Sequence, residues 1–145
     1  MRRFDFFHHF GGAAWVLSNA LAAVAVGGSL GALARFAVSR WTQARTGGLF
    51  PWGTLAVNLA GCFGAGLLFG LFEDSVVSPS LRAFLLIGFL GAFTTFSTYS
   101  VETLNLLRDG EVRFAVFNAL LNNVIGLALT LAGWWSARIV LRFLR

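Results

Sequence analysis

Hydroxyl and aromatic side chains are interleaved in one short stretch of an otherwise apolar part of the sequence. Five serine and threonine residues fall between positions 94 and 100, with Phe96 and Tyr99 among them. Hydroxyl groups can bond back to carbonyl groups of the preceding helical turn, and glycine and β-branched threonine weaken a helix. The stretch therefore predicts a break in a helix. Its hydroxyl residues are Thr94, Thr95, Ser97, Thr98 and Ser100.

A helix break inside a membrane exposes backbone groups that have two chemical uses. Carbonyl oxygens at the end of the first half-helix could hold a cation, as in transporters with discontinuous helices. Amides and hydroxyls could line a path for an anion, and the ring edges of Phe96 and Tyr99 would add the positive rim of the aromatic quadrupole. Conduction also needs binding that is weak enough to release the ion. For Phe96, ordinary core packing is an equally good interpretation.

Three asparagines interrupt other apolar runs. The carboxamide of Asn58 must face the interior of a helix bundle, where its NH₂ group could donate to an anion or form an interhelical hydrogen bond. We expect only one of the neighbours Asn122 and Asn123 to line a pathway, because adjacent residues on a helix face different ways. Near span ends, Arg35 could attract anions into a vestibule or extend to the headgroups. Glu102 could pair with an arginine or close a pathway.

These residues lie within four apolar runs that are long enough to be membrane-spanning helices. A span needs about 20 apolar residues to cross a hydrocarbon core about 30 Å thick. The runs cover about 13–38, 54–72, 83–107 and 114–137. The chain is 57% hydrophobic, more than a soluble domain of 145 residues can bury, so lipid must surround most of these side chains. The connections leave no room for a soluble catalytic domain, and no nucleophile–base pair or metal-ligand cluster indicates an enzyme.

We predict one transmembrane domain over residues 13–145, preceded by an extension over residues 1–12. The extension resembles the charged start of a signal peptide, but the apolar run after it is too long for a signal core, which favours a retained segment. The adjacent His8 and His9 are interpreted as incidental rather than as metal ligands. Cys62 is the single cysteine, so it cannot form a disulfide within the chain.

All 11 basic residues are arginines, and they fall almost equally on the two predicted sides of the membrane. One side would hold the six arginines at 2, 3, 82, 138, 142 and 145, and the other the five at 35, 40, 45, 108 and 113. Because excess arginine and lysine mark the cytoplasmic side, this balance predicts insertion in both orientations and an antiparallel homodimer. The arginines flank apolar runs instead of forming one patch, which argues against nucleic-acid binding.

Three sequence segments resemble those of the Fluc (CrcB) family of fluoride channels. They are GGSLGALARF at 27–36, GTLAVN at 53–58 and GAFTTFSTY at 91–99. The third is the most specific in a membrane context, and the resemblance extends over residues 27–138. The chain departs from the family at Tyr99, where phenylalanine is usual, and at Phe36, where tyrosine is more common.

The resemblance implies an all-α antiparallel dual-topology homodimer in the plasma membrane, with the third span broken and two separate fluoride pores. It further implies a structural sodium ion at the dimer centre, held by the backbone carbonyl groups of Gly91 and Thr94 from both subunits. The fluoride pathway would be lined by Asn58, Phe96, Tyr99, Ser97 and Thr98.

The implied activity is passive export of fluoride from the cytoplasm, with no ATP site or proton-coupling carboxylate. The alternative from another class is a proton-coupled exporter resembling the small multidrug resistance proteins, which also have four spans. That chemistry needs a carboxylate deep in the first span, and this span has none. A scaffold whose glycines only pack helices would not explain the hydroxyl groups at mid-membrane.

Overall fold

The computed structural model describes residues 14–73 and 76–143, and side chains from residue 19 onward. The predicted extension over residues 1–12, with His8 and His9, lies outside the described residues. The first two crossings are α1 (Ala14–Thr46) and α2 (Trp52–Glu73). The third consists of α3 (Pro79–Arg82), η2 (Ala83–Leu90), α4 (Gly91–Phe93) and α5 (Phe96–Arg108), and the fourth of α6 (Val112–Leu120), η3 (Leu121–Ile125) and α7 (Gly126–Phe143). The segments η2 and η3 are π-helical.

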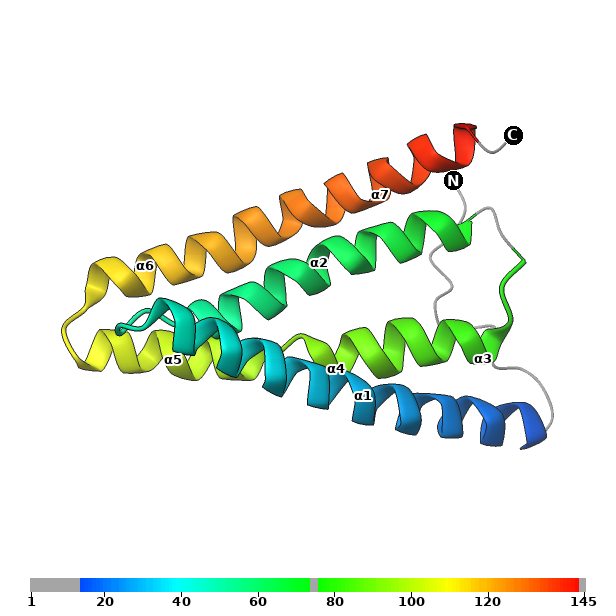
Figure 1. Cartoon of the computed structure of the whole chain (residues 1–145), viewed down its shortest axis with the longest axis horizontal. Helices are drawn as coiled ribbons and strands as arrows, with labels where there is room; N and C mark the ends of the chain where they lie inside the picture. The colour runs from blue at the N-terminus through cyan, green and yellow to red at the C-terminus, as the bar shows by residue number, and fades with distance from the viewer. Residues whose placement is uncertain (1–13, 74–75, 144–145) are drawn as a thin grey trace.

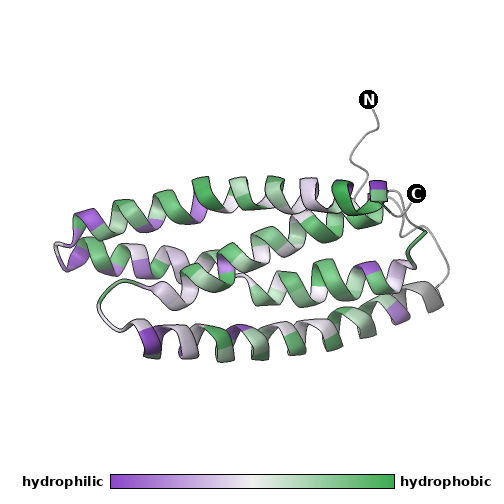
Figure 2. Cartoon of the chain, turned by 45° about the horizontal axis from the view of Figure 1, so that its top comes forward, coloured by the Kyte–Doolittle hydropathy of each residue, from purple (hydrophilic) through white to green (hydrophobic). Residues whose placement is uncertain are grey.

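The four crossings run alternately up and down, so that the start of α1 and the end of α7 lie at the same end of the bundle (Figure 1). Hydrophobic residues dominate the length of the helices, and hydrophilic residues are most frequent toward the helix ends (Figure 2). The α2 helix packs most extensively against α7, and α1 packs against η2 and α4. This arrangement places the middle of α2 beside the third and fourth crossings.

Each crossing is long and apolar enough to span a bilayer. The helical stretches measured over 19–46, 52–73, 79–108 and 112–143 have mean hydropathies between 1.5 and 1.9. Only 11–28% of the most apolar window in each is buried within the chain, so most of this apolar surface is available to lipid or to another subunit. The four predicted spans are confirmed, but the first helix continues to Thr46 and the fourth to Phe143, beyond the predicted ends.

The tight connection between α1 and α2 is fixed by two glycines and one glutamine. Gly47 and Gly48 have φ angles of +65° and +76°, a region that side chains with a Cβ atom rarely adopt. The Gln43 amide donates to the carbonyl oxygens of Gly48 (3.3 Å) and Phe50 (3.2 Å), and its oxygen accepts from the backbone N–H of Gly53 (3.1 Å). One side chain thus satisfies backbone groups on both sides of the turn.

Close backbone contact between α2 and α7 depends on glycine. A Cβ atom added to Gly133 would lie 2.2 Å from the carbonyl oxygen of Phe63, and one added to Gly66 would lie 1.9 Å from that of Thr130. Small residues let membrane helices approach closely where no hydrophobic effect drives their association. Gly66 and Gly133 therefore act as packing residues, and their contacts fix the position of α2 in the bundle.

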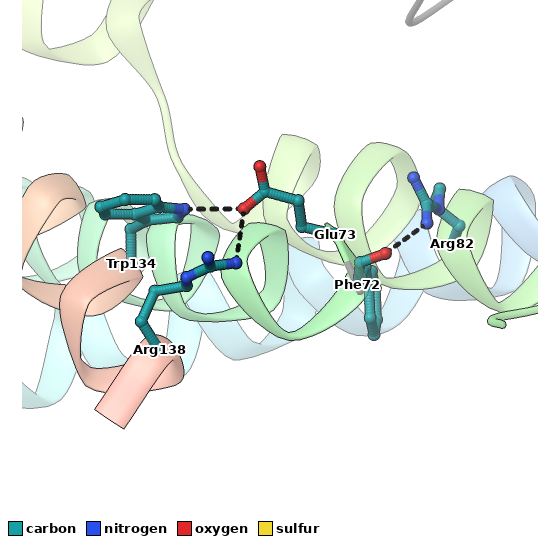
Figure 3. A network of polar contacts seen from close by, with 5 residues as sticks. All are labelled: Phe72, Glu73, Arg82, Trp134 and Arg138. Atoms are coloured by element: carbon teal, nitrogen blue, oxygen red, sulfur yellow. Dashed lines mark hydrogen bonds and ion pairs between the residues drawn. The ribbon is translucent and has the colours of Figure 1, made fainter. Parts of the chain in front are cut away.

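A polar cluster joins the far end of α2 to its neighbours (Figure 3). The Glu73 carboxylate accepts hydrogen bonds from Trp134 Nε1 (3.2 Å) and from Arg138 (3.5 Å), both on α7. The guanidinium group of Arg82, at the end of α3, donates to the carbonyl oxygen of Phe72 (2.9 Å). Because Glu73 and Arg138 are partly exposed, the ion pair contributes only about 0–1 kcal/mol. Together with the Arg82 bond, it connects α2 to both α7 and α3.

The Gly133 contact predicts a selective loss of stability. Gly133→Ala should destabilise the fold by about 1–3 kcal/mol, because the added methyl group meets backbone that cannot rotate away. Gly28→Ala is the matched control, since its Cβ would lie 4.0 Å from the nearest atom of the neighbouring helix, the carbonyl oxygen of Gly88. Thermal unfolding in detergent should show a lower midpoint for Gly133→Ala alone. Equal midpoints would contradict the close-packing interpretation.

Candidate functional site

The third crossing is broken between α4 and α5, in the predicted hydroxyl-rich stretch. Thr94 (φ −86°, ψ 158°) and Thr95 (φ −151°, ψ 110°) are both extended. The Thr94 hydroxyl donates back to the carbonyl oxygen of Leu90 (3.0 Å), and the Thr95 hydroxyl accepts from the backbone N–H of Thr98 (3.2 Å) as an N-cap of α5. The prediction of a helix break is confirmed, and its threonines close both half-helices.

Asn58 on α2 pairs with the exposed backbone of the break. Its Oδ1 accepts from the N–H of Thr95 (2.8 Å), and its Nδ2 donates to the carbonyl oxygen of Thr95 (3.2 Å). Its second amide proton goes to Oδ1 of Asn122 (2.8 Å). The interhelical interpretation of Asn58 is confirmed, and donation to an anion would require one of these bonds to open.

Several carbonyl groups lose their helical partners at the break, among them those of Gly91 and Thr94. In an unbroken helix, the N–H of Thr95 would bond to the carbonyl oxygen of Gly91, and the N–H of Thr98 to that of Thr94. Here these donors bond instead to the side chains of Asn58 and Thr95. The carbonyl oxygens of Gly91 and Thr94 therefore retain unused acceptor capacity beside the groove described below, whose lining includes both residues.

A chain of side-chain hydrogen bonds continues from Asn58 into the fourth crossing. The Asn122 amide donates to Oδ1 (2.9 Å) and to the carbonyl oxygen (3.0 Å) of Asn118. Asn118, which is fully buried, donates to the Thr103 hydroxyl (2.9 Å), and this hydroxyl donates to the carbonyl oxygen of Tyr99 (2.8 Å). Asn118 and Thr103 were not among the residues predicted from the sequence, although positions 118 and 122 are one helical turn apart.

The expectation that only one of Asn122 and Asn123 lines the site is wrong. Both line the same groove, and Asn123 Nδ2 donates to the Tyr99 hydroxyl (3.1 Å) while Asn122 bonds to Asn58. The two residues lie in η3, where the wider π-helical turn rotates the chain by less per residue than an α-helix does. Adjacent side chains can therefore reach neighbouring parts of one site.

The aromatic pair lies directly after the break. The Phe96 and Tyr99 rings meet edge to face, with centroids 5.1 Å apart and an interplanar angle of 61°. Phe96 is 73% exposed within the single chain, whereas Tyr99 is 8% exposed. This exposure argues against core packing of Phe96 within one chain. Ser97 and Thr98 are exposed beside the pair, and their hydroxyls lie 3.3 and 2.9 Å from the Thr95 hydroxyl.

An open groove of about 810 Å³ brings most of these groups together. The predicted residues among its lining are Asn58, Gly91, Thr94, Phe96 and Tyr99, joined by Thr95, Asn122 and Asn123. The lining does not include Ser97 or Thr98. The groove combines acceptors, donors and ring edges within helices that are otherwise apolar, and it is open along one side of the chain.

Glu102 and Arg35 lie outside this groove. Glu102 accepts a hydrogen bond from the Thr54 hydroxyl (2.7 Å), and its second carboxylate oxygen is buried without a partner in the part of the chain that the structure describes. It lines a separate cavity of about 300 Å³ that Arg40 and Asp109 also line. Arg35 is half-buried on α1. Among the described residues, no arginine pairs with Glu102.

Known proteins are similar to this chain over most of its length. Residues 22–134 match the family model described as CrcB-like protein, Camphor Resistance (CrcB). A protein of Desulforapulum autotrophicum, named fluoride-specific ion channel FluC, is 43% identical over 118 residues, which cover 81% of this chain and 94% of the relative. A protein of the same name from Magnetococcus marinus is 52% identical over 101 residues, covering 69% and 82%. The chain therefore belongs to the CrcB family.

Proposed function

We propose that this chain is a fluoride-specific ion channel that lets fluoride leave the cell passively. The observation that carries the proposal is the groove at the helix break, where amides, hydroxyls and aromatic edges meet inside an apolar membrane protein. Polar groups at this depth are costly unless they serve a pathway or a partner. The names of the FluC relatives support fluoride as the ion.

The chemistry of the groove suits a small, hard anion. Neutral N–H and O–H donors, with the positive ring edges of Phe96 and Tyr99, attract an anion without the full charge that would trap it. Fluoride enters cells as neutral HF from acidic surroundings and dissociates in the more alkaline cytoplasm. A negative membrane potential then drives the anion outward, with about 2.3 kcal/mol per charge for each 100 mV.

A proton-coupled exporter of the small multidrug type is less well supported. The sequence has no aspartate or glutamate between residues 6 and 72, so neither α1 nor the groove face of α2 offers a deep carboxylate. Glu102, on the third crossing, lines the separate cavity and not the groove. Passive conduction needs no carboxylate in the groove.

The finer assembly that we propose is an antiparallel dual-topology homodimer with two pores. One chain leaves the groove open along its side and leaves Phe96 73% exposed, so a second copy is needed to enclose the path. The near-equal division of arginines between the two sides supports opposite insertion of the two copies.

A sodium ion held between the two copies fits the freed carbonyl groups. Hard cations prefer oxygen ligands, and the carbonyl oxygens of Gly91 and Thr94 have lost their helical donors to Asn58 and Thr95. We propose that both carbonyls, contributed by each copy, would hold the ion. When bound, it would supply positive charge that joins the two broken helices.

The sodium proposal predicts that the cation is needed for the assembled channel. Protein purified and reconstituted with N-methylglucamine as the only cation should lose most of its fluoride efflux, because the four carbonyl groups would repel one another. Restoring sodium should recover the efflux. Full efflux after exhaustive sodium removal would exclude a required ion.

Opposite insertion predicts that both ends of the chain reach both sides of the membrane. Reporters fused to the C-terminus that are active only in the cytoplasm or only outside it should both give signal from one population of cells. Signal from one reporter alone would refute dual topology. As a further test, arginine added to one predicted side should increase the fraction of chains inserted in one orientation.

The pathway predicts a specific loss of flux on changing one ring. Phe96→Ile should reduce fluoride efflux from liposomes by roughly tenfold or more, because isoleucine fills space without a positive ring edge. A fluoride electrode measures the rate, and chloride efflux is followed in parallel. Phe143→Ile, at an exposed position at the end of α7, is the matched control and should retain the wild-type rate. Unchanged flux in Phe96→Ile, with the dimer intact, would remove Phe96 from the pathway.

A further inference from the structure

We propose that the Tyr99 hydroxyl donates a hydrogen bond to fluoride in the groove. Asn123 is the positioning residue: it donates to the Tyr99 oxygen and so leaves the hydroxyl proton available for fluoride. The inference rests on the proposed function, because it concerns the same pathway. It gives a role to the hydroxyl that distinguishes this chain at a position where its resemblance to the Fluc family predicts phenylalanine.

The Tyr99 hydroxyl is held in one direction. Its oxygen accepts from Asn123 Nδ2 at 3.1 Å, and its ring is 8% exposed and packed against the edge of Phe96. A phenolic hydroxyl can both donate and accept. No described residue accepts its proton, so Tyr99, which lines the groove, carries an unused donor whose oxygen already accepts a bond from Asn123.

The orientation of the Asn123 amide determines which of the two residues donates in the hydrogen bond between Asn123 and Tyr99. Its Nδ2 also lies 2.8 Å from the carbonyl oxygen of Ala119, which can only accept. A flipped amide would place Oδ1 against that carbonyl oxygen, so the NH₂ group must face both Ala119 and Tyr99. Asn123 can therefore act only as a donor to the tyrosine oxygen. An amide in the opposite orientation would accept the hydroxyl proton and remove it from the groove.

The π-helical turn makes this contact available. Asn122 points toward Asn58 and bonds to it, and the π-helical turn η3 brings Asn123 to the same groove. This one π turn therefore places Asn122 against Asn58 at the break and Asn123 against Tyr99 in the aromatic pair. A hydroxyl whose oxygen accepts from an amide donates a stronger hydrogen bond than an isolated hydroxyl does. Hydrogen bonds to a charged acceptor are also stronger than those between neutral groups. Chloride is larger and accepts hydrogen bonds more weakly, so the Tyr99 hydroxyl would stabilise bound chloride less than bound fluoride.

The single tyrosine of the sequence allows a direct test. Protein labelled with ¹³Cζ-tyrosine and reconstituted in liposomes gives one tyrosine ¹³Cζ resonance. We expect sodium fluoride to shift this resonance saturably and sodium chloride to leave it in place. Asn123→Leu should weaken the fluoride response, whereas Asn19→Leu, the same change on an exposed position of α1, should retain it. A resonance that does not respond to fluoride in a conducting protein would overturn the proposal.

A double-mutant cycle on fluoride efflux separates this role from general packing. Tyr99→Phe and Asn123→Leu should each slow fluoride efflux by roughly tenfold, the size expected for one hydrogen bond to a charged group. The double variant should be no slower than the slower single variant, because Asn123 acts through the hydroxyl. Additive losses, or a Tyr99→Phe variant that keeps the wild-type rate and selectivity, would contradict the proposal.

The same assays keep this inference distinct from the proposed function. If Phe96→Ile slows efflux while Tyr99→Phe does not, the pathway stands and the hydroxyl role fails. If the wild-type dimer passes no fluoride, the proposed function fails and the hydroxyl role fails with it. Each variant is compared at equal dimer content, measured by its elution volume.

Discussion

The structure depends on satisfying the backbone groups that a broken helix exposes inside a membrane. Water is absent there, so each unpaired N–H or C=O group costs several kcal/mol. The Asn58 carboxamide meets this constraint by bonding to both backbone groups of Thr95, as a neighbouring strand would. These bonds leave carbonyl oxygens at the break, including those of Gly91 and Thr94, with spare acceptor capacity. The same bonds that make the break tolerable also make it chemically useful.

The rest of the bundle holds Asn58 in place. Glycine contacts with α7 and the polar cluster at Glu73 fix α2, so that its middle faces the break. Asn122 then directs the second amide proton of Asn58, and fully buried Asn118 directs Asn122. Each of these hydrogen bonds contributes about 0.5–1.5 kcal/mol net, but removing one would leave a buried partner unsatisfied at greater cost. The network therefore specifies one geometry at the groove.

Much of this could be predicted from the sequence because membranes impose simple rules. Apolar runs give the spans, and the hydroxyl-rich stretch at 94–100 gives the break. The partners could not be predicted, because they depend on how the crossings pack. Asn122 and Asn123 illustrate the difference: their adjacency excluded a shared face only for an α-helix, and no sequence pattern revealed the π turn. Likewise, the bond of Glu102 to Thr54 joins residues 48 positions apart. The positions of the spans agree with the apolar runs, but the helix ends do not, because the first and fourth helices continue beyond the apolar part of each run.

We propose that the groove at the break is an uncoupled path for fluoride. Reversal potentials measured across planar bilayers distinguish such a path from coupled transport, with a tenfold sodium fluoride gradient, symmetric chloride and equal pH on both sides. A passive fluoride channel should give a reversal potential near the fluoride equilibrium value of about 59 mV in magnitude, with the sign set by an anion. It also predicts no change when a pH gradient is added. A reversal potential near zero, or one that follows the pH gradient, would contradict a passive fluoride-selective channel.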